Sequence, residues 1–298
     1  MTDLRSEVFR WIETERHPSW ELHLRPGGQF WSGLNRVPDH EKLGFEELLI
    51  ALRERLAGRR DPCHLTLRVL RDACSRLLWH RQTLLTLAPA YRNFAAWLRE
   101  HHGNGQPNAI VSLNWDLVAE AALQYGAVPW RYNSGTCCVP ILKPHGSINW
   151  SNYKDRGLVA QSPDWELIAP SSPFSYIPRD PFFDPFGSGV NQRLRQVIFP
   201  GDSENEDGIA KIWDEASKAI QEREVVVFIG YSLPPYDSEA SKFLRDSCAG
   251  KRIEVCARSR ATLDRYRKTF GDLATKDALG FASSPYARPR REKAGNRA

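Results

Sequence analysis

Short apolar segments that alternate with amphipathic helical segments are the feature of this sequence that most restricts its fold. "AIVSL" (109–113), "VPILK" (139–143), "EVVVFIG" (224–230) and "RIEVCA" (252–257) have the length and apolar character of buried strands. The segments between and after them have the apolar spacing of helices. Strands that alternate with helices of about 10–15 residues predict a mainly parallel sheet flanked by helices, which is an α/β fold.

The predicted helices and one further strand account for most of the remaining chain. Helical spacing in residues 46–57 stops at Gly58, and the same spacing in residues 116–126 stops at Gly126. Residues 64–100 continue the helical pattern in two segments that are broken near Pro89. The other predicted elements are a strand at 195–200 and helices at 207–222, 236–248 and 259–270.

The pattern predicts one domain over residues 1–284, with a helical insertion at 42–102 and an irregular insertion at 147–192. The irregular insertion is rich in Pro, Ser and aromatic residues, and a loop of this length is typical of a lid over a site. Residues 285–298 form a basic tail with Pro and Gly, which we expect to be solvated and disordered.

Charge and hydropathy argue against two classes of partner. The tail carries five basic residues and one acidic residue, so it holds four of the five net positive charges of the chain. The body therefore lacks the one-sided basic surface of nucleic-acid binders, and binding of DNA or RNA through the tail is the weaker alternative. The longest apolar run, 225–230, is too short to span a membrane, and the N-terminus lacks a secretory signal. We expect a cytoplasmic protein.

The six cysteines show no metal-binding spacing. No C-x-x-C pair occurs, which excludes a zinc ribbon built on such pairs, and no zinc is expected. Cys137 and Cys138 are neighbours, which rarely bridge each other. We expect all six to be reduced thiols, most of them buried.

Polar residues follow three of the predicted strands, at the ends where open α/β sheets bind ligands. Residues 112–116 read Ser-Leu-Asn-Trp-Asp, His145-Gly146 follow the second strand, and residues 230–232 read Gly-Tyr-Ser. Each group also has an ordinary structural interpretation. Asn and Asp between a strand and a helix are common N-caps, a Gly-x-Ser turn is common in loops, and His145 could cap a loop through the backbone.

Taken in order, these groups resemble a known family. "SLNWD", "KPHGSINW" and "VVFIGYSLPPYD" are similar to the Asn-x-Asp, His-Gly and Gly-x-Ser motifs of the sirtuin-like NAD-binding superfamily. The resemblance covers roughly residues 42–270. It is greatest to the bacterial branch without a zinc ribbon, which includes NAD-degrading effectors of anti-phage defence. It implies a Rossmann-like, sirtuin-like sheet and a site for NAD or ADP-ribose.

The resemblance also implies roles for individual residues. His145 would be the general base toward a ribose hydroxyl or water, Asn114 would hold the nicotinamide ribose or the attacking water, and Asp116 would lie near the nicotinamide amide. A base with an ordinary pKa near 6.5 suits a bond that breaks through an oxocarbenium-like centre with a neutral leaving group. The implied cofactor-binding residues are Ser112, Asn114, Asp116, Gly146, Gly230 and Ser232.

One part of the family pattern is missing. The family begins with a strand and a Gly-rich phosphate loop, whereas "RPGGQFWSG" (25–33) follows no apolar strand. In the family this strand lies between the strands predicted at 109–113 and 224–230, so we expect two unpaired inner edges. Either the chain is truncated upstream, which we favour, or a partner supplies the strand.

Two functions follow from these expectations. The first is hydrolysis of NAD to nicotinamide and ADP-ribose, which is favoured over NAD-dependent deacylation because the zinc module is absent. The second is a truncated, catalytically inactive module that binds a nucleotide or a protein. The acceptor of the reaction, a homo-oligomeric state and a partner protein are left open.

Overall fold

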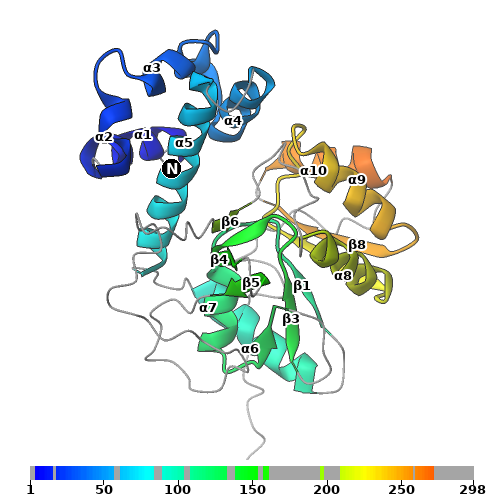
Figure 1. Cartoon of the computed structure of the whole chain (residues 1–298). Helices are drawn as coiled ribbons and strands as arrows, with labels where there is room; N and C mark the ends of the chain where they lie inside the picture. Colours follow the sequence, from blue (N-terminus) through cyan, green and yellow to red (C-terminus); the bar gives the residue numbers. More distant parts are fainter. Residues whose placement is uncertain are drawn as a thin grey trace, which may run out of the picture.

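The computed structural model describes the helices and strands of two structural parts (Figure 1). The first part consists of the N-terminal helices, and the second contains the strands with the helices around them. The described residues are 4–15, 18–56, 61–83, 89–103, 108–132, 138–153, 157–160, 195–197, 209–257 and 259–271, and the structural statements below concern these residues.

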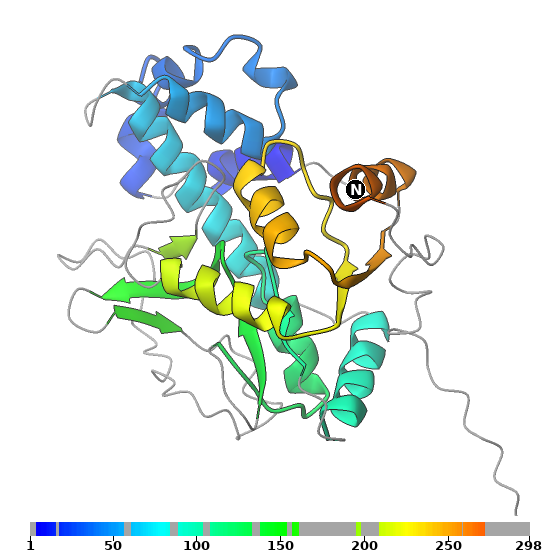
Figure 2. The same cartoon turned by 90° about the vertical axis from the view of Figure 1, so that its right-hand side faces the viewer.

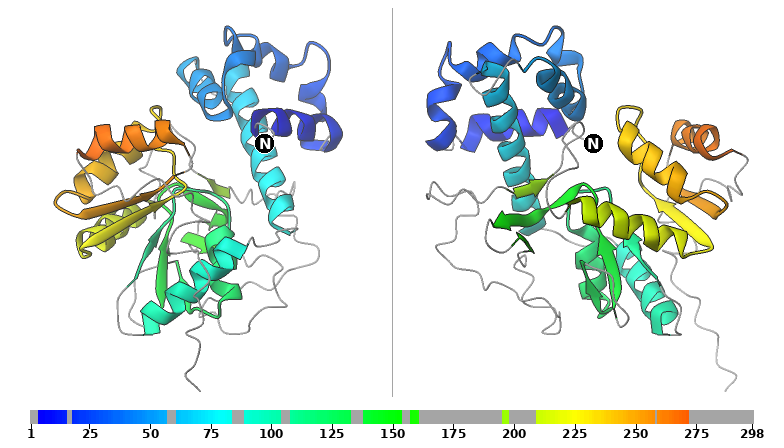
Figure 3. Two further views of the ribbon diagram at one scale, coloured as in Figure 1. Left: turned by 180° about the vertical axis from the view of Figure 1, so that it is seen from behind. Right: turned by 45° about the vertical axis from the view of Figure 1, so that its right-hand side comes forward.

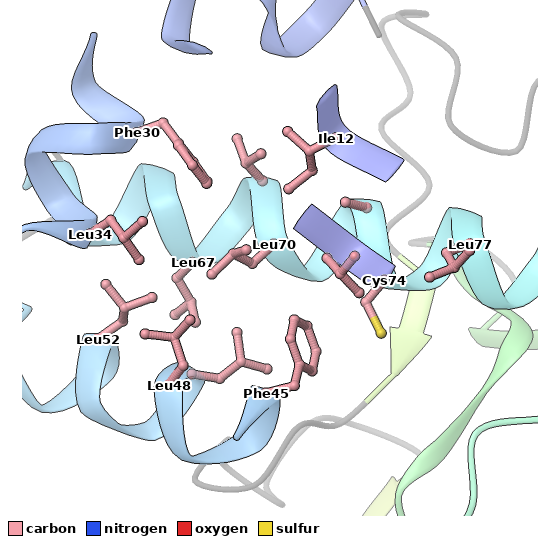
Figure 4. Close-up of a cluster of buried hydrophobic side chains, with 14 of the residues drawn as sticks. Ile12, Phe30, Leu34, Phe45, Leu48, Leu52, Leu67, Leu70, Cys74 and Leu77 are labelled. Atoms are coloured by element: carbon pink, nitrogen blue, oxygen red, sulfur yellow. The ribbon is translucent and has the colours of Figure 1, made fainter. Parts of the chain in front are cut away.

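The N-terminal helices pack around one long helix, α5. Apolar residues of α4 recur at helical spacing (Phe45, Leu48, Leu49 and Leu52), so one face of α4 is buried against α5. Gly33 of α3 lies so close to α5 that an added Cβ would stand 2.5 Å from the carbonyl oxygen of Pro62. The apolar side chains converge from several helices (Figure 4). The bounds are α1 Leu4–Glu15, α2 Pro18–Leu24, α3 Gln29–Leu34, η1 His40–Lys42, α4 Phe45–Glu54 and α5 Pro62–Thr83.

The second part contains parallel strands flanked by helices, which confirms the predicted α/β fold class. β3 lies between β1 and β2, and both pairings are parallel; β7 and β8 form a separate parallel pair. The helices cover these strands (Figure 2). The bounds are α6 Pro89–Gly103, β1 Ile110–Val111, α7 Val118–Tyr125, β2 Trp130–Arg131, β3 Val139–Leu142, α8 Ile209–Gln221, β7 Val225–Ile229, α9 Ser238–Ser247, β8 Arg252–Cys256 and α10 Arg260–Phe270.

Two apolar cores hold this part together. Leu98 of α6, Leu123 of α7 and Trp213 of α8 pack with Ile141 of β3 in the first core. In the second core, α8, α9 and α10 cover β7 and β8, where Tyr266 is fully buried. Both cores are contacted by Val111 and Leu113, so the end of β1 is packed against both strand systems.

The start of the insertion predicted to be irregular is regular instead. β4 (Gly146–Tyr153) pairs antiparallel with β5 (Gly157–Ala160) and with β6 (Arg195–Val197). The prediction was wrong for these residues because pairing with neighbouring strands, rather than local apolar spacing, specifies β4 and β5. Residues 161–194 lie outside the described residues, as does the tail 285–298.

The N-terminal region also differs from expectation. Helices α1, α2 and α3 occupy residues 4–15, 18–24 and 29–34, for which the sequence predicted no element, and α5 reaches from this cluster to β4 (Figure 3). Gly27 and Gly28 connect α2 to α3 and Gly33 lies within α3, so residues 25–33 follow a helix and are not a phosphate loop after a strand. Among the described strands, β1 pairs only with β3, and β7 pairs only with β8.

Five of the six cysteines lie in the described residues, and they are buried and reduced, as the sequence predicted. Cys63, Cys74, Cys138, Cys248 and Cys256 are buried free thiols, and Cys137 lies outside the described residues. Within the described ranges, no group of three His, Cys, Asp or Glu side chains could hold a metal ion. No described helix is long and apolar enough to cross a membrane.

Candidate functional site

A cavity of about 280 Å³ lies where three parallel strands end. Asn114 and Asp116 follow β1, His145 follows β3, and Gly230 and Ser232 follow β7; all five residues line the cavity. The three polar groups singled out in the sequence therefore converge on one site. This placement leaves their proposed roles as predictions, but it meets the geometric condition on which those roles depend.

The N-terminal helices form another wall of the cavity. Leu4 of α1, Glu46 of α4 and Leu78 of α5 line the same space as the strand ends. Sequence reasoning placed none of these residues in the site. No local signal could have identified them, because only the packing of the helical part against the strand ends brings them there.

Two predicted site residues do not line the cavity and instead shape the backbone beside it. The Ser112 N–H donates to the Leu142 carbonyl at 2.8 Å, which extends the β1–β3 pairing, and the Ser112 hydroxyl accepts from the Asn114 N–H at 3.3 Å. Gly146 has φ +73°, and its N–H donates to the Lys143 carbonyl at 2.8 Å. Glycine follows His145 because this turn needs a left-handed residue.

His145 is buried at the edge of the cavity, with an exposed fraction of 8%. Its Nδ1 lies 3.2 Å from the Leu113 carbonyl oxygen. A carbonyl can only accept, so Nδ1 carries the hydrogen and Nε2 of the neutral ring keeps its lone pair. Burial lowers the pKa of His145, and the nearby Asp237 carboxylate partly opposes this effect. The site therefore holds a neutral imidazole whose Nε2 can accept a proton.

Asp237 is the residue of this site that sequence reasoning missed most clearly. Its Oδ2 lies 3.7 Å from His145 Nε2 and accepts a hydrogen bond of 2.7 Å from the Tyr231 hydroxyl. Its Oδ1 accepts the Ala240 N–H at 3.2 Å and so caps α9. The available signal was its place as the last residue of "GYSLPPYD", at the start of the helix predicted at 236–248, where Asp is a common N-cap.

A buried ion pair between Lys143 and Glu120 supports the turn after β1. Asp116 Oδ1 accepts the Val118 N–H at 3.1 Å, but the N-cap of α7 is Leu117, so Asp116 stands one residue before the N-cap position that its structural interpretation gave it. Lys143 Nζ donates to the Asp116 carbonyl oxygen and lies 3.0 Å from Glu120 Oε1. Glu120 also accepts the Tyr132 hydroxyl at 2.9 Å. Lys143 therefore ties the turn that carries Asn114 to the strand that leads to His145.

The lining of the cavity is acidic and aromatic. Glu46, Asp116 and Asp237 contribute carboxylates, and the described lining includes no lysine or arginine. Trp115, Tyr231 and Tyr236 contribute aromatic rings. Burial, followed by the charge of Glu46, raises the pKa of Tyr236 to about 12, and burial also raises the pKa of Tyr231. Such a lining favours a flat or cationic group over an anionic one.

Comparison with known proteins finds a match among solved structures but none among protein-family models or curated proteins. Among solved structures, the chain is similar to a mutant Sir2 homologue in complex with ADP-ribose, at 15% sequence identity and a TM-score of 0.42. The similarity covers 75% of this chain and 75% of the other chain.

Proposed function

We propose that this chain is a sirtuin-like NAD-binding protein that hydrolyses NAD to nicotinamide and ADP-ribose. The observation that carries the proposal is the convergence of Asn114, His145 and Ser232 on one cavity at the ends of β1, β3 and β7. Ligands of open α/β sheets bind at this edge. The motif resemblance supplies the identity of the ligand, and a role in anti-phage defence in a bacterial cell rests on that resemblance alone.

The cavity fits the nicotinamide end of NAD better than the whole dinucleotide. Ligand sites are roughly 300–1,000 Å³, so a cavity of about 280 Å³ accommodates only one part of a dinucleotide. The pyridinium ring of NAD is flat and positively charged, and the lining offers the carboxylates of Glu46, Asp116 and Asp237 beside aromatic rings. The pyrophosphate would extend beyond these residues.

The chemistry needs few groups. The bond between the ribose carbon and the pyridinium nitrogen breaks, and its electron pair leaves with neutral nicotinamide. Water adds to the ribose carbon, and His145 Nε2 accepts its proton, so the products are nicotinamide, ADP-ribose and one proton. Asn114 would hold the ribose or the water, and the carboxylates would stabilise the positive charge that develops on the ribose.

The test is to incubate the purified chain with NAD and to measure free nicotinamide and ADP-ribose. Equal amounts of the two products support hydrolysis with water as acceptor. An inactive nucleotide-binding or protein-interaction module is the second candidate, because the described residues contain no strand followed by a Gly-rich phosphate loop. Calorimetric binding of NAD without product formation would favour that candidate, and so would the absence of both binding and turnover.

A further inference from the structure

We propose that Asp237 is a positioning residue for His145, which holds the imidazole in one orientation and stabilises it when Nε2 takes up a proton. The catalytic consequence depends on the proposed NAD hydrolysis, whereas the pairing of the two side chains can be tested without it. The carrying observation is that Asp237 Oδ2 lies 3.7 Å from His145 Nε2 in a buried setting.

Both side chains are fixed independently of each other. The carboxylate of Asp237 is held at Oδ1 by the Ala240 N–H and at Oδ2 by the Tyr231 hydroxyl. The imidazole of His145 is held at Nδ1 by the Leu113 carbonyl, and its ring lies 5.6 Å from the ring of Trp213. Because each group is fixed by a different element, the separation of Nε2 and Oδ2 is set by the fold.

The distance between His145 Nε2 and Asp237 Oδ2 leaves Nε2 able to act as a base, because the two atoms do not form a permanent ion pair. At 3.7 Å, Nε2 and Oδ2 are farther apart than a normal hydrogen bond, so the Nε2 lone pair is not committed to the carboxylate. Once Nε2 has accepted a proton, a carboxylate at this distance in a buried site attracts the new charge strongly. The proton taken from water or a ribose hydroxyl would then lie on Nε2, facing Asp237.

The other charged groups around His145 are also acidic. Glu239, in the first turn of α9, acts on the imidazole in the same direction as Asp237, and Asp116 and Glu46 line the cavity. Asp237 differs from these because its Oδ2 lies 3.7 Å from Nε2 and because its carboxylate is fixed by two hydrogen bonds, one at each oxygen. Removal of the charge of Asp237 alone should therefore change the pKa of the His145 imidazole.

The test is the variant Asp237→Asn, because Asn is also a good N-cap and keeps the shape of the side chain. The imidazole of His145 is followed by NMR titration in the ligand-free protein, with its signal assigned by its loss in His145→Gln. We expect its pKa to fall below the wild-type value in Asp237→Asn and to stay unchanged in the control Asp246→Asn, an exposed position of α9.

With NAD, kcat of Asp237→Asn should fall about tenfold or more because positioning is lost, and KM should rise as well because a carboxylate that lines the cavity is neutralised. An unchanged imidazole titration would overturn the proposal whatever the turnover. If wild-type protein shows no turnover, the proposed function fails and the titration still decides the pairing. If Asp237→Asn does not fold, Asp237→Ser, which is also an uncharged N-cap, takes its place in the titration.

Discussion

Lys143 and Glu120 form an ion pair with 3.0 Å between Nζ and Oε1, and their side chains are 0% and 1% exposed. Lys143 follows β3 and Glu120 lies in α7, so the pair joins two elements that both lead to the cavity. Lys143 also donates to the Asp116 carbonyl. The pair therefore supports the turn between β1 and α7 on which Asn114 stands.

Lys143→Met should destabilise the protein by about 3–5 kcal/mol, because it leaves the carboxylate of Glu120 buried without its cation. Urea denaturation measures the change. The double variant Lys143→Met/Glu120→Leu should recover much of the loss, since both charges are then removed. A single variant as stable as the wild type would show that the pair does not hold this turn.

His145→Ala and Asn114→Ala should each reduce NAD hydrolysis by about 100-fold or more, as expected for loss of a general base or of the group that holds its substrate. The melting temperature should change little in Asn114→Ala, because Asn114 is exposed. Asn35→Ala is the matched control, since Asn35 is exposed and does not line the cavity. Nicotinamide release measures all three; full activity of His145→Ala would show that the base is assigned wrongly.

The rate should depend on pH in one direction set by His145. The pKa of this group is lowered from 6.5, chiefly by burial, and a base acts only when unprotonated. Between pH 8 and about pH 6.5, kcat/KM should therefore stay level, and it should fall only at lower pH. Nicotinamide release measured at a series of pH values checks this; an acid limb that starts above pH 6.5 would contradict it.

The acidic lining should make the cavity select for charge. Nicotinamide riboside is a cation, so it should bind more tightly to the wild-type protein than to the variant Glu46→Gln. We expect the affinity of the variant for this ligand to be about tenfold lower. ADP-ribose, an anion, should bind no more weakly to the variant than to the wild type. Calorimetry measures both ligands, with Glu54→Gln, at an exposed position of the same helix, as the control. Equal affinities in all three proteins would place Glu46 outside the binding site.

Most helices and strands after residue 44 could be predicted from the sequence because they depend on local apolar spacing, whereas α1, α2 and α3 were not predicted. The predicted strand at 224–230 is β7 (Val225–Ile229), and the predicted helix at 259–270 is α10 (Arg260–Phe270). β4 and β5 could not be predicted in this way, because their residues become strands by pairing with each other and with β6.

The sequence by itself determined the α/β class and the three groups of polar residues at strand ends, since both follow from residue type and local spacing. Only the tertiary structure decided that these groups share a cavity with Glu46, and that Asp237 faces His145 while Ser112 and Gly146 do not line the cavity. These relationships depend on how distant segments pack and on the direction of each side chain. Neither is recorded in the local pattern of residues.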